Sequence, residues 1–251
     1  GQRGTNIPVP TDIATHAQYN LVSVSGENVR SIYADAFDVN YQKVQALGTP
    51  RTDDYFNKKL ISKKKRQIYL KHPKLLFKSV IVYAPTFRDT DGNRNEFHPE
   101  IDFDRLSKSL LPNQVLLICP HPIMDAPILP HEYRNILEVR DFSTNDYMLI
   151  SDMLITDYSS VIFEYALLGK PIAFFCYDLL RYDRDFYLKY PDDLPGDVFK
   201  TQEELTAYLR NPEKHVLTDK YTTFVKKYMS ACDGHSCERI AQLINSYMEE
   251  N

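Results

Sequence analysis

The chain has 251 residues, 43% of them hydrophobic, so it can bury a substantial core and is not expected to be disordered. Its formal net charge of -4 argues against a protein that holds nucleic acid through its overall charge, and no nucleic-acid partner is expected. The four cysteines are few for this length and two lie in apolar runs, so the sequence predicts a reducing cytoplasm rather than a disulfide framework.

Short apolar runs rich in β-branched residues alternate with helical segments along the chain. This alternation is typical of a parallel sheet covered on both faces, and it predicts an α/β fold with a doubly wound sheet. We expect residues 1–18 to be an N-terminal segment or linker and residues 19–251 to form one large domain. The predicted strands are residues 21–25, 44–47, 80–83, 115–119, 136–139, 153–156 and 172–176. The predicted helices are residues 29–37, 53–70, 103–110, 146–151, 161–168, 202–209, 220–229 and 238–249.

The largest cluster of charge is KKLISKKKRQIYLKHPK, residues 58–74. Such a run suits contact with anionic lipid or with a polyanionic acceptor, and it equally suits a solvated helix face. No stretch approaches the roughly 20 apolar residues that a transmembrane helix needs. Any contact with a membrane is therefore expected to be peripheral.

Ligands of an open parallel sheet bind beyond the carboxyl ends of its strands. The strongest such place is ITDYSSVIFEYALLGKP, where a strand ends at Thr156 and a helix follows as far as Gly169. A helix N-terminus presents unpaired N–H groups, so Ser159 and Ser160 in this turn predict an anion-binding site. The alternative is that one serine only caps the helix.

Three other strand ends carry side chains that suit a phosphate group. His121 stands between two prolines in CPHP, where the rigid backbone would direct its ring into the crevice. Arg88 follows YAPTF and Arg51 lies in GTPRTD, and each offers a planar fork of donors. For each of the three, a purely structural role remains open at this point.

Other motifs are weak or missing. Cys232, His235 and Cys237 lie close together, but without a fourth ligand or a paired CxxC they do not predict a zinc site. There is no G-x-G-x-x-G segment and no P-loop, so the sequence predicts neither nicotinamide chemistry nor ATP hydrolysis. No metal site and no cofactor are expected.

Several segments, taken together and in order, resemble the CDP-glycerol glycerophosphotransferase family of teichoic acid and capsule enzymes. They span most of residues 44–240 and comprise ALGTPRTDDYF, YAPTFRD, RDFSTNDYMLISDMLITDYSSVIFEYALLGKPIAFF, LPGDVFKTQEEL and DGHSCERI. The resemblance implies a glycosyltransferase-B architecture of two Rossmann-like domains, of which this chain would be the donor-binding half. It further implies that the diphosphate is held by Arg88, His121, Ser159 and Ser160, that Asp157 orients the serine loop, and that Asp233 and Arg239 belong to a closing structural element.

The implied reaction moves glycerol phosphate or ribitol phosphate from a CDP-linked donor to an acceptor hydroxyl and releases CMP. The acceptor would be a polyol phosphate or glycan, which can be lipid-linked, at the inner face of the cell membrane. The family's Trp-His-Gly segment has no counterpart here and His16 lacks its context, so the general base is expected in an upstream acceptor domain. The alternatives are a nucleotide-sugar glycosyltransferase or epimerase of the same plan, and a non-catalytic donor-like module.

Overall fold

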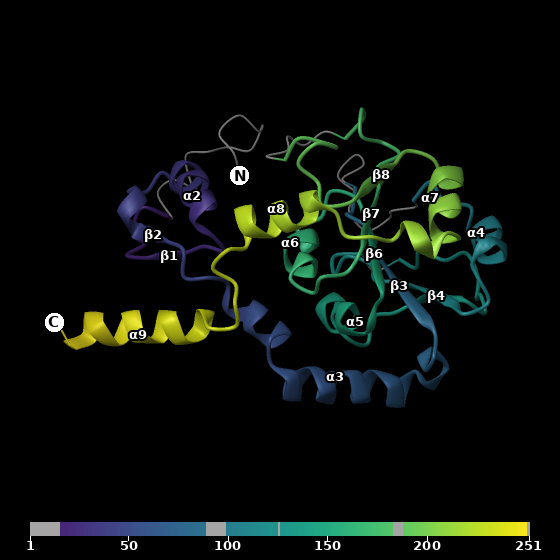
Figure 1. Ribbon diagram of the computed structural model, residues 1–251, viewed down its shortest axis with the longest axis horizontal. Helices are drawn as coiled ribbons and strands as arrows, with labels where there is room; N and C mark the ends of the chain where they lie inside the picture. Colours follow the sequence, from purple (N-terminus) through teal and green to yellow (C-terminus); the bar gives the residue numbers. More distant parts are fainter. Residues whose placement is uncertain (1–15, 89–98, 125, 183–187, 250–251) are drawn as a thin grey trace.

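A six-stranded parallel sheet forms the centre of the larger part of the molecule, on the right in Figure 1. The computed structural model describes residues 16–88, 99–124, 126–182 and 188–249. The sheet has the order β5-β4-β3-β6-β7-β8. Its strands are β3 (Ser79–Ala84), β4 (Gln114–Ile118), β5 (Ile136–Glu138), β6 (Met153–Thr156), β7 (Ile172–Phe175) and β8 (Asp197–Phe199). Counted along the chain within this sheet the order is 3-2-1-4-5-6, that of dinucleotide-binding Rossmann domains, which confirms the predicted fold class.

Helices cover both faces of this sheet because its strands are apolar on both sides. Val80 and Val82 of β3 point to the face covered by α3, α5, α6 and α8, while Ile81 and Tyr83 point to the face covered by α4 and α7. The described helices are α2 (Arg30–Phe37), α3 (Lys58–Lys71), α4 (Phe103–Ser109), α5 (Thr144–Ile150), α6 (Val161–Ala166), α7 (Gln202–Leu209), α8 (Asp219–Tyr228) and α9 (Ser236–Glu249). Within the described ranges, no helix is both long and apolar enough to cross a bilayer.

The first two predicted strands do not extend the main sheet. The prediction of a single doubly wound sheet is therefore corrected to two separate sheets. They are shorter than predicted, β1 (Val22–Ser23) and β2 (Val44–Gln45), and they pair in parallel with each other alone. Each has one buried and one partly exposed residue, so neither can lie in the middle of a sheet covered on both faces. The strand β8 was not predicted, since its three residues form no recognisable apolar run.

The helix predicted from residue 53 starts later, because two signals interrupt it. Residues Pro50–Tyr55 form a 3-10 helix, and Asn57 then caps α3 by accepting a hydrogen bond from the Leu60 N–H at 3.1 Å. After α6, Gly169 has φ +62, the left-handed conformation that lets the chain leave the helix toward β7.

Candidate functional site

A pocket opens at the carboxyl edge of the sheet. It lies beside the point where the helix after β3 packs on one face of the sheet and the helix after β6 packs on the other. Open sheets of this order bind their ligands at such a switch point. The pocket has a volume of about 320 Å³ and is lined by the loops that follow β3, β4 and β6. It brings together Arg51, His121, Ser159 and Ser160, four of the six predicted binding residues.

His121 is exposed at this pocket, and its ring orientation is fixed from two sides. Its Nδ1 accepts the Ile123 backbone N–H at 3.3 Å, and its ring lies against Phe87 with centroids 4.8 Å apart. Partial burial lowers the pKa of the imidazole, which favours the neutral form. Because Nδ1 accepts, the proton of the neutral ring is on Nε2, and Nε2 is left to donate to a ligand.

The two serines differ in their contacts. Ser159 Oγ accepts the Val161 N–H at 3.3 Å, as expected of a residue that helps to start the helix. Ser160 is the N-cap residue of α6, yet its side chain makes no capping hydrogen bond. With only six residues, α6 has a short dipole. The pocket therefore presents the exposed Ser160 hydroxyl as its main serine donor.

Two pocket residues, Glu164 and Asn145, were missed by sequence reasoning. The Glu164 carboxylate is buried, pairs with Arg51 Nη2, and accepts a hydrogen bond from Asn145 Nδ2 at 2.7 Å. The Arg51 side chain itself is 68% exposed. Glu164 thus holds one end of the guanidinium while the rest of it remains accessible from the pocket. An acidic residue inside an amphipathic helix was the available signal, and the sequence analysis did not use it.

Arg88 and Asp157, the remaining two predicted residues, lie outside the pocket lining and bind each other. Arg88 Nη2 donates to Asp157 at 2.9 Å, and its Nε donates to Asp178 at 2.7 Å. Asp157 is 1% exposed and also accepts the backbone N–H of Thr86 at 2.9 Å. Burial raises the Asp157 pKa, but the donors converging on it require an ionised carboxylate. The contacts among Arg88, Asp157 and Asp178 hold together the loops that follow β3, β6 and β7.

Arg88, Asp157 and Asp178 form a buried clamp of charged side chains. The sequence did not reveal the role of Asp178 in it. Burial pushes its pKa upward, but hydrogen bonding and charge from Arg88 outweigh burial, and the pKa lies below its usual value. Its Oδ1 also accepts the Tyr158 hydroxyl at 2.9 Å. The Tyr158 ring stacks on Tyr182 with centroids 4.0 Å apart, and the Arg88 guanidinium lies 5.1 Å from the Tyr158 ring centre. The clamp thus sets the backbone path directly before Ser159 and Ser160.

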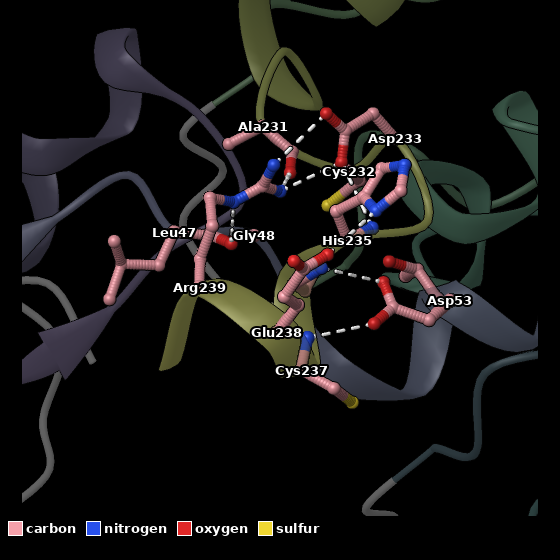
Figure 2. A network of polar contacts seen from close by, with 12 residues as sticks. Leu47, Gly48, Asp53, Ala231, Cys232, Asp233, His235, Cys237, Glu238 and Arg239 are labelled. Atoms are coloured by element: carbon pink, nitrogen blue, oxygen red, sulfur yellow. Dashed lines mark hydrogen bonds and ion pairs between the residues drawn. The ribbon is translucent and has the colours of Figure 1, made fainter. Parts of the chain in front are cut away.

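A second network joins the segment that carries Arg51 to the start of α9 (Figure 2). Asp53 accepts the backbone N–H groups of Ser236 and Cys237 at 3.0 and 2.8 Å, and so caps α9 from a distant part of the chain. Arg239 donates from Nε to the Leu47 carbonyl at 3.0 Å and from two nitrogens to Asp233. The contacts of Asp233 and Arg239 are structural, as expected.

Gly48 is part of the same network for a steric reason. It has φ +91, and a Cβ there would lie 2.2 Å from Ser236 Oγ and 2.4 Å from the Ala231 carbonyl oxygen. Only glycine allows the turn before Arg51 to approach α9 this closely.

We expect Asp53→Ala to lower the free energy of unfolding by about 1 kcal/mol, the usual value of an N-cap. Hydrogen bonds from α9 outweigh burial and keep the Asp53 pKa below its usual value. A carboxylate with a depressed pKa stabilises the fold above its unfolded pKa and loses this effect as the pH falls. Urea denaturation should show the difference from wild type at pH 7 and a smaller one near pH 3. Asp54→Ala, at an exposed neighbour, is the control, and an equal loss there would contradict the capping role.

The cysteine and histidine residues near α9 do not converge on one point. Cys232 is buried, whereas His235 is exposed and pairs with Glu238 at 3.1 Å. In the part of the chain that the structure describes, no three His, Cys, Asp or Glu side chains are grouped as a metal site would require.

Comparison with protein families identifies the chain. The model of the CDP-glycerol:poly(glycerophosphate) glycerophosphotransferase family matches residues 3–246. The chain belongs to this family. A teichoic acid poly(ribitol-phosphate) polymerase of Bacillus spizizenii is 39% identical over 245 residues, which cover 94% of this chain and 39% of the relative. A teichoic acid glycerol-phosphate transferase of Staphylococcus aureus is 33% identical and covers 85% of this chain and 57% of its own length.

Solved structures extend the comparison to the fold. The wall teichoic acid polymerase TagF, soaked with CDPG, superposes with a TM-score of 0.84 at 30% identity, over 99% of this glycerophosphotransferase-family chain and 64% of TagF. A UDP-GlcNAc 2-epimerase of Neisseria meningitidis has a TM-score of 0.52 at 18% identity, which shows a shared fold alone. The chain therefore spans 39% of the Bacillus polymerase, 57% of the Staphylococcus transferase and 64% of TagF.

Proposed function

We propose that this chain binds the CDP-linked donor for a polyol-phosphate transfer in teichoic acid synthesis. The observation that carries the proposal is the pocket at the switch point, where three donor-bearing loops meet in a chain of this family. The side chains at the pocket, Arg51, His121 and Ser160, are suited to a diphosphate. Whether glycerol or ribitol is carried depends on groups outside these contacts.

In the proposed reaction, an acceptor hydroxyl oxygen attacks the β-phosphorus of the CDP-polyol. The new phosphorus–oxygen bond joins the polyol phosphate to the acceptor as a phosphodiester. The bond from the β-phosphorus to the bridging oxygen breaks, and CMP leaves with that electron pair. The hydroxyl proton passes to a general base that we place upstream of this chain. Negative charge grows on the phosphoryl oxygens during transfer, so fixed donors stabilise the transition state.

His121 Nε2 is the donor best fixed for that task. The neutral imidazole needs no counter-charge. The contacts with Ile123 and Phe87 hold the ring in place before the CDP-linked substrate binds. Ser160 adds a hydroxyl, and Arg51 adds a cation whose position depends on Glu164. Arg88, Asp157 and Asp178 act as positioning residues, because their charged groups are already bound to one another.

The upstream part of the protein is proposed to dock on α9. This helix extends beyond the main body in Figure 1. One side of it carries apolar residues at helical spacing, and three of them, Ile244, Tyr247 and Met248, are 49%, 48% and 75% exposed. Residues 240 and 243 continue the stripe. An exposed apolar stripe of this kind suits a partner surface, and the proposed acceptor domain is the partner that the reaction needs.

The acceptor is proposed to be a polyol phosphate, held near the inner face of the cell membrane if it is lipid-linked. This places the protein in the cytoplasm with a peripheral membrane contact. The segment of residues 58–78 supports that contact, since it contains nine Lys and Arg and no Asp or Glu.

Two substitutions test the donor site. His121→Ala and Ser160→Ala each remove one hydrogen bond to a charged group, so CDP affinity should fall roughly ten- to hundredfold. Titration calorimetry with CDP measures the effect, and circular dichroism checks that both variants are folded. Ser159→Ala should weaken binding less, because its Oγ already accepts the Val161 N–H. Wild-type affinity in folded His121→Ala and Ser160→Ala would contradict the assignment of the pocket.

A further inference from the structure

The connection between β4 and β5 is unusual for two paired parallel strands. It runs over residues 119–135, and its described residues form neither a helix nor a strand. Parallel strands are normally joined by a crossover that contains a helix. Without a helix, the backbone groups of this connection need hydrogen-bond partners from other parts of the chain. The connection begins with the segment that carries His121, so its conformation bears on the donor pocket.

Glu138, the last residue of β5, supplies partners for the middle of the connection. Its Oε2 accepts the backbone N–H of Ile128 at 2.8 Å and that of Leu129 at 3.2 Å. The Glu138 side chain is only 14% exposed, so these hydrogen bonds are largely shielded from water. A carboxylate that accepts backbone N–H groups forms stronger hydrogen bonds than a neutral acceptor does.

Arg140, two residues further along the chain, supplies partners for the first part of the connection. Its guanidinium donates to the carbonyl of Met124 and, at 2.9 Å, to the carbonyl of Ala126. It also donates from Nε and Nη2 to Glu138 Oε1, at 2.9 and 2.7 Å. Glu138 and Arg140 therefore form one ion pair that holds four backbone groups of the connection.

A short series of hydrogen bonds leads from Arg140 to the ring of His121. Arg140 holds the carbonyl of Met124, and the Met124 N–H donates to the His121 carbonyl at 2.8 Å, which closes a turn. Within this turn, the Ile123 N–H donates to His121 Nδ1 at 3.3 Å. That contact leaves the proton of the neutral ring on Nε2. The tautomer and direction of the ring thus depend on a turn whose last residue is held by Arg140.

Apolar packing also anchors the connection, but it cannot fix the ring by itself. Met124 and Ile128 are 1% and 3% exposed and belong to the core on the face of the sheet covered by α4 and α7. Apolar contacts are non-directional, whereas hydrogen bonds fix the orientation of the peptide groups that form them. His121 is exposed, so burial does not hold its ring.

We propose that Glu138 and Arg140 are positioning residues for His121. They hold the turn of residues 121–124 so that the ring presents its Nε2–H group to the pocket before a ligand binds. Neither side chain is among the described residues that line the donor pocket. The inference rests on the proposed function, in which His121 donates to the diphosphate. A ring that is ordered in advance lowers the entropic cost of binding.

Nitrogen NMR of the imidazole tests this geometry without any nucleotide. In protein labelled with nitrogen-15 at histidine, protonated and unprotonated ring nitrogens have well-separated chemical shifts. His121→Ala identifies the His121 signals among those of the seven histidines. Wild-type His121 should show the Nε2–H tautomer at pH 8, and in Arg140→Ala both signals should move toward the average of two exchanging tautomers. Unchanged signals in an Arg140→Ala protein that circular dichroism shows to be folded would overturn the inference.

Two further variants complete this measurement. Arg134→Ala removes the same charge from the same connection, at an exposed residue just before β5, and should leave the His121 signals as in wild type. Equal shifts in Arg134→Ala and Arg140→Ala would indicate general loosening of the connection and contradict the inference. Glu138→Gln keeps the shape of the side chain but cannot accept from both Arg140 and the connection with two oxygens. If Arg140→Ala does not fold, unchanged His121 signals in Glu138→Gln overturn the inference instead.

A double-mutant cycle on CDP affinity tests whether Arg140 acts through His121. Arg140→Ala should weaken CDP binding by about tenfold if the binding-competent ring orientation falls to about a tenth of the population. In the His121→Ala background, the same change should have little further effect, because the ring that it positions is absent. Equal weakening in both backgrounds, measured by titration calorimetry, would mean that Arg140 supports the pocket as a whole and would contradict a role through His121.

The outcomes separate this inference from the donor-site proposal. Wild-type CDP affinity in His121→Ala would refute the role of His121 in the donor site, and the NMR signals would still decide whether Arg140 positions the ring. A weakened His121→Ala, together with wild-type signals and wild-type CDP affinity in Arg140→Ala, would leave the donor site standing and refute the positioning role.

Discussion

Arg88→Ala is expected to lower the free energy of unfolding by about 3–5 kcal/mol, the usual effect of removing one partner from a buried ion pair. The Arg88 side chain is 16% exposed, and its loss would leave Asp157 and Asp178 as neighbouring carboxylates without their cation. Thermal and urea denaturation both measure the change. We expect CDP binding to weaken as well, because the serine loop follows Asp157 directly.

The pH dependence gives this prediction a definite sign. In the variant, the unpaired carboxylates would have raised pKa values and would become neutral as the pH falls, which relieves their repulsion. In the wild type, the lowered Asp178 pKa means that its stabilising effect is lost as the pH falls through that value. The stability gap between the two proteins should therefore be largest near pH 7 and shrink toward pH 4.

Arg181→Ala is the matched control for the same measurement. Arg181 pairs with Glu100 at 2.7 Å, but both side chains are more than half exposed. A surface pair of this kind contributes little to stability, because solvent screens the two charges. If Arg88→Ala and Arg181→Ala lowered stability equally, Arg88 would not be the centre of a buried clamp.

Transfer of polyol phosphate by these 251 residues alone is expected to be slow. The pocket accounts for donor binding, but neither the general base nor the acceptor site has been assigned to this chain. Absence of a positioned base usually costs about a hundred- to ten-thousandfold in rate, and absence of acceptor positioning adds to that loss. Incubation with labelled CDP-glycerol and a lipid-linked acceptor should release little CMP.

Adding the proposed upstream acceptor domain, covalently or in trans, should restore CMP release. Replacing Ile244 and Met248 of α9 by polar residues should weaken the rescue in trans, because these side chains form the proposed docking stripe. Rapid turnover by the isolated chain would mean that a base within it has been overlooked, and His16 and His121 would be the first residues to examine.

The sequence was a better guide to the side chains that carry hydrogen-bond donors at the strand ends than to the residues that contact them in the fold. His121, Ser159 and Ser160 could be placed because each directly follows a strand whose apolar run is easy to recognise. Arg88 also follows a strand, but its role depends on Asp178, which belongs to the loop after another strand. Neighbours of that kind come from the folded topology and leave no local pattern in the chain.

For the fold, the positions of the strands could be predicted from the sequence, but the pairing of all the strands could not. The long apolar strands of the main sheet, such as Ser79–Ala84, were found within about two residues, because burial on both faces leaves a continuous apolar run. The two short strands near the N-terminal end were found too, but not their separation from the main sheet. Periodicity indicates that a segment is a strand, whereas strand pairing depends on contacts between distant segments.

The most direct test of the donor site is a calorimetric comparison of CDP with cytidine on the wild-type chain. The donors in the pocket are suited to the diphosphate, so CDP should bind clearly more tightly, by about tenfold or more for each charged hydrogen bond that cytidine lacks. CMP should lie between the two. Equal affinity for CDP and cytidine would contradict the central claim that Arg51, His121 and Ser160 hold the diphosphate of the donor.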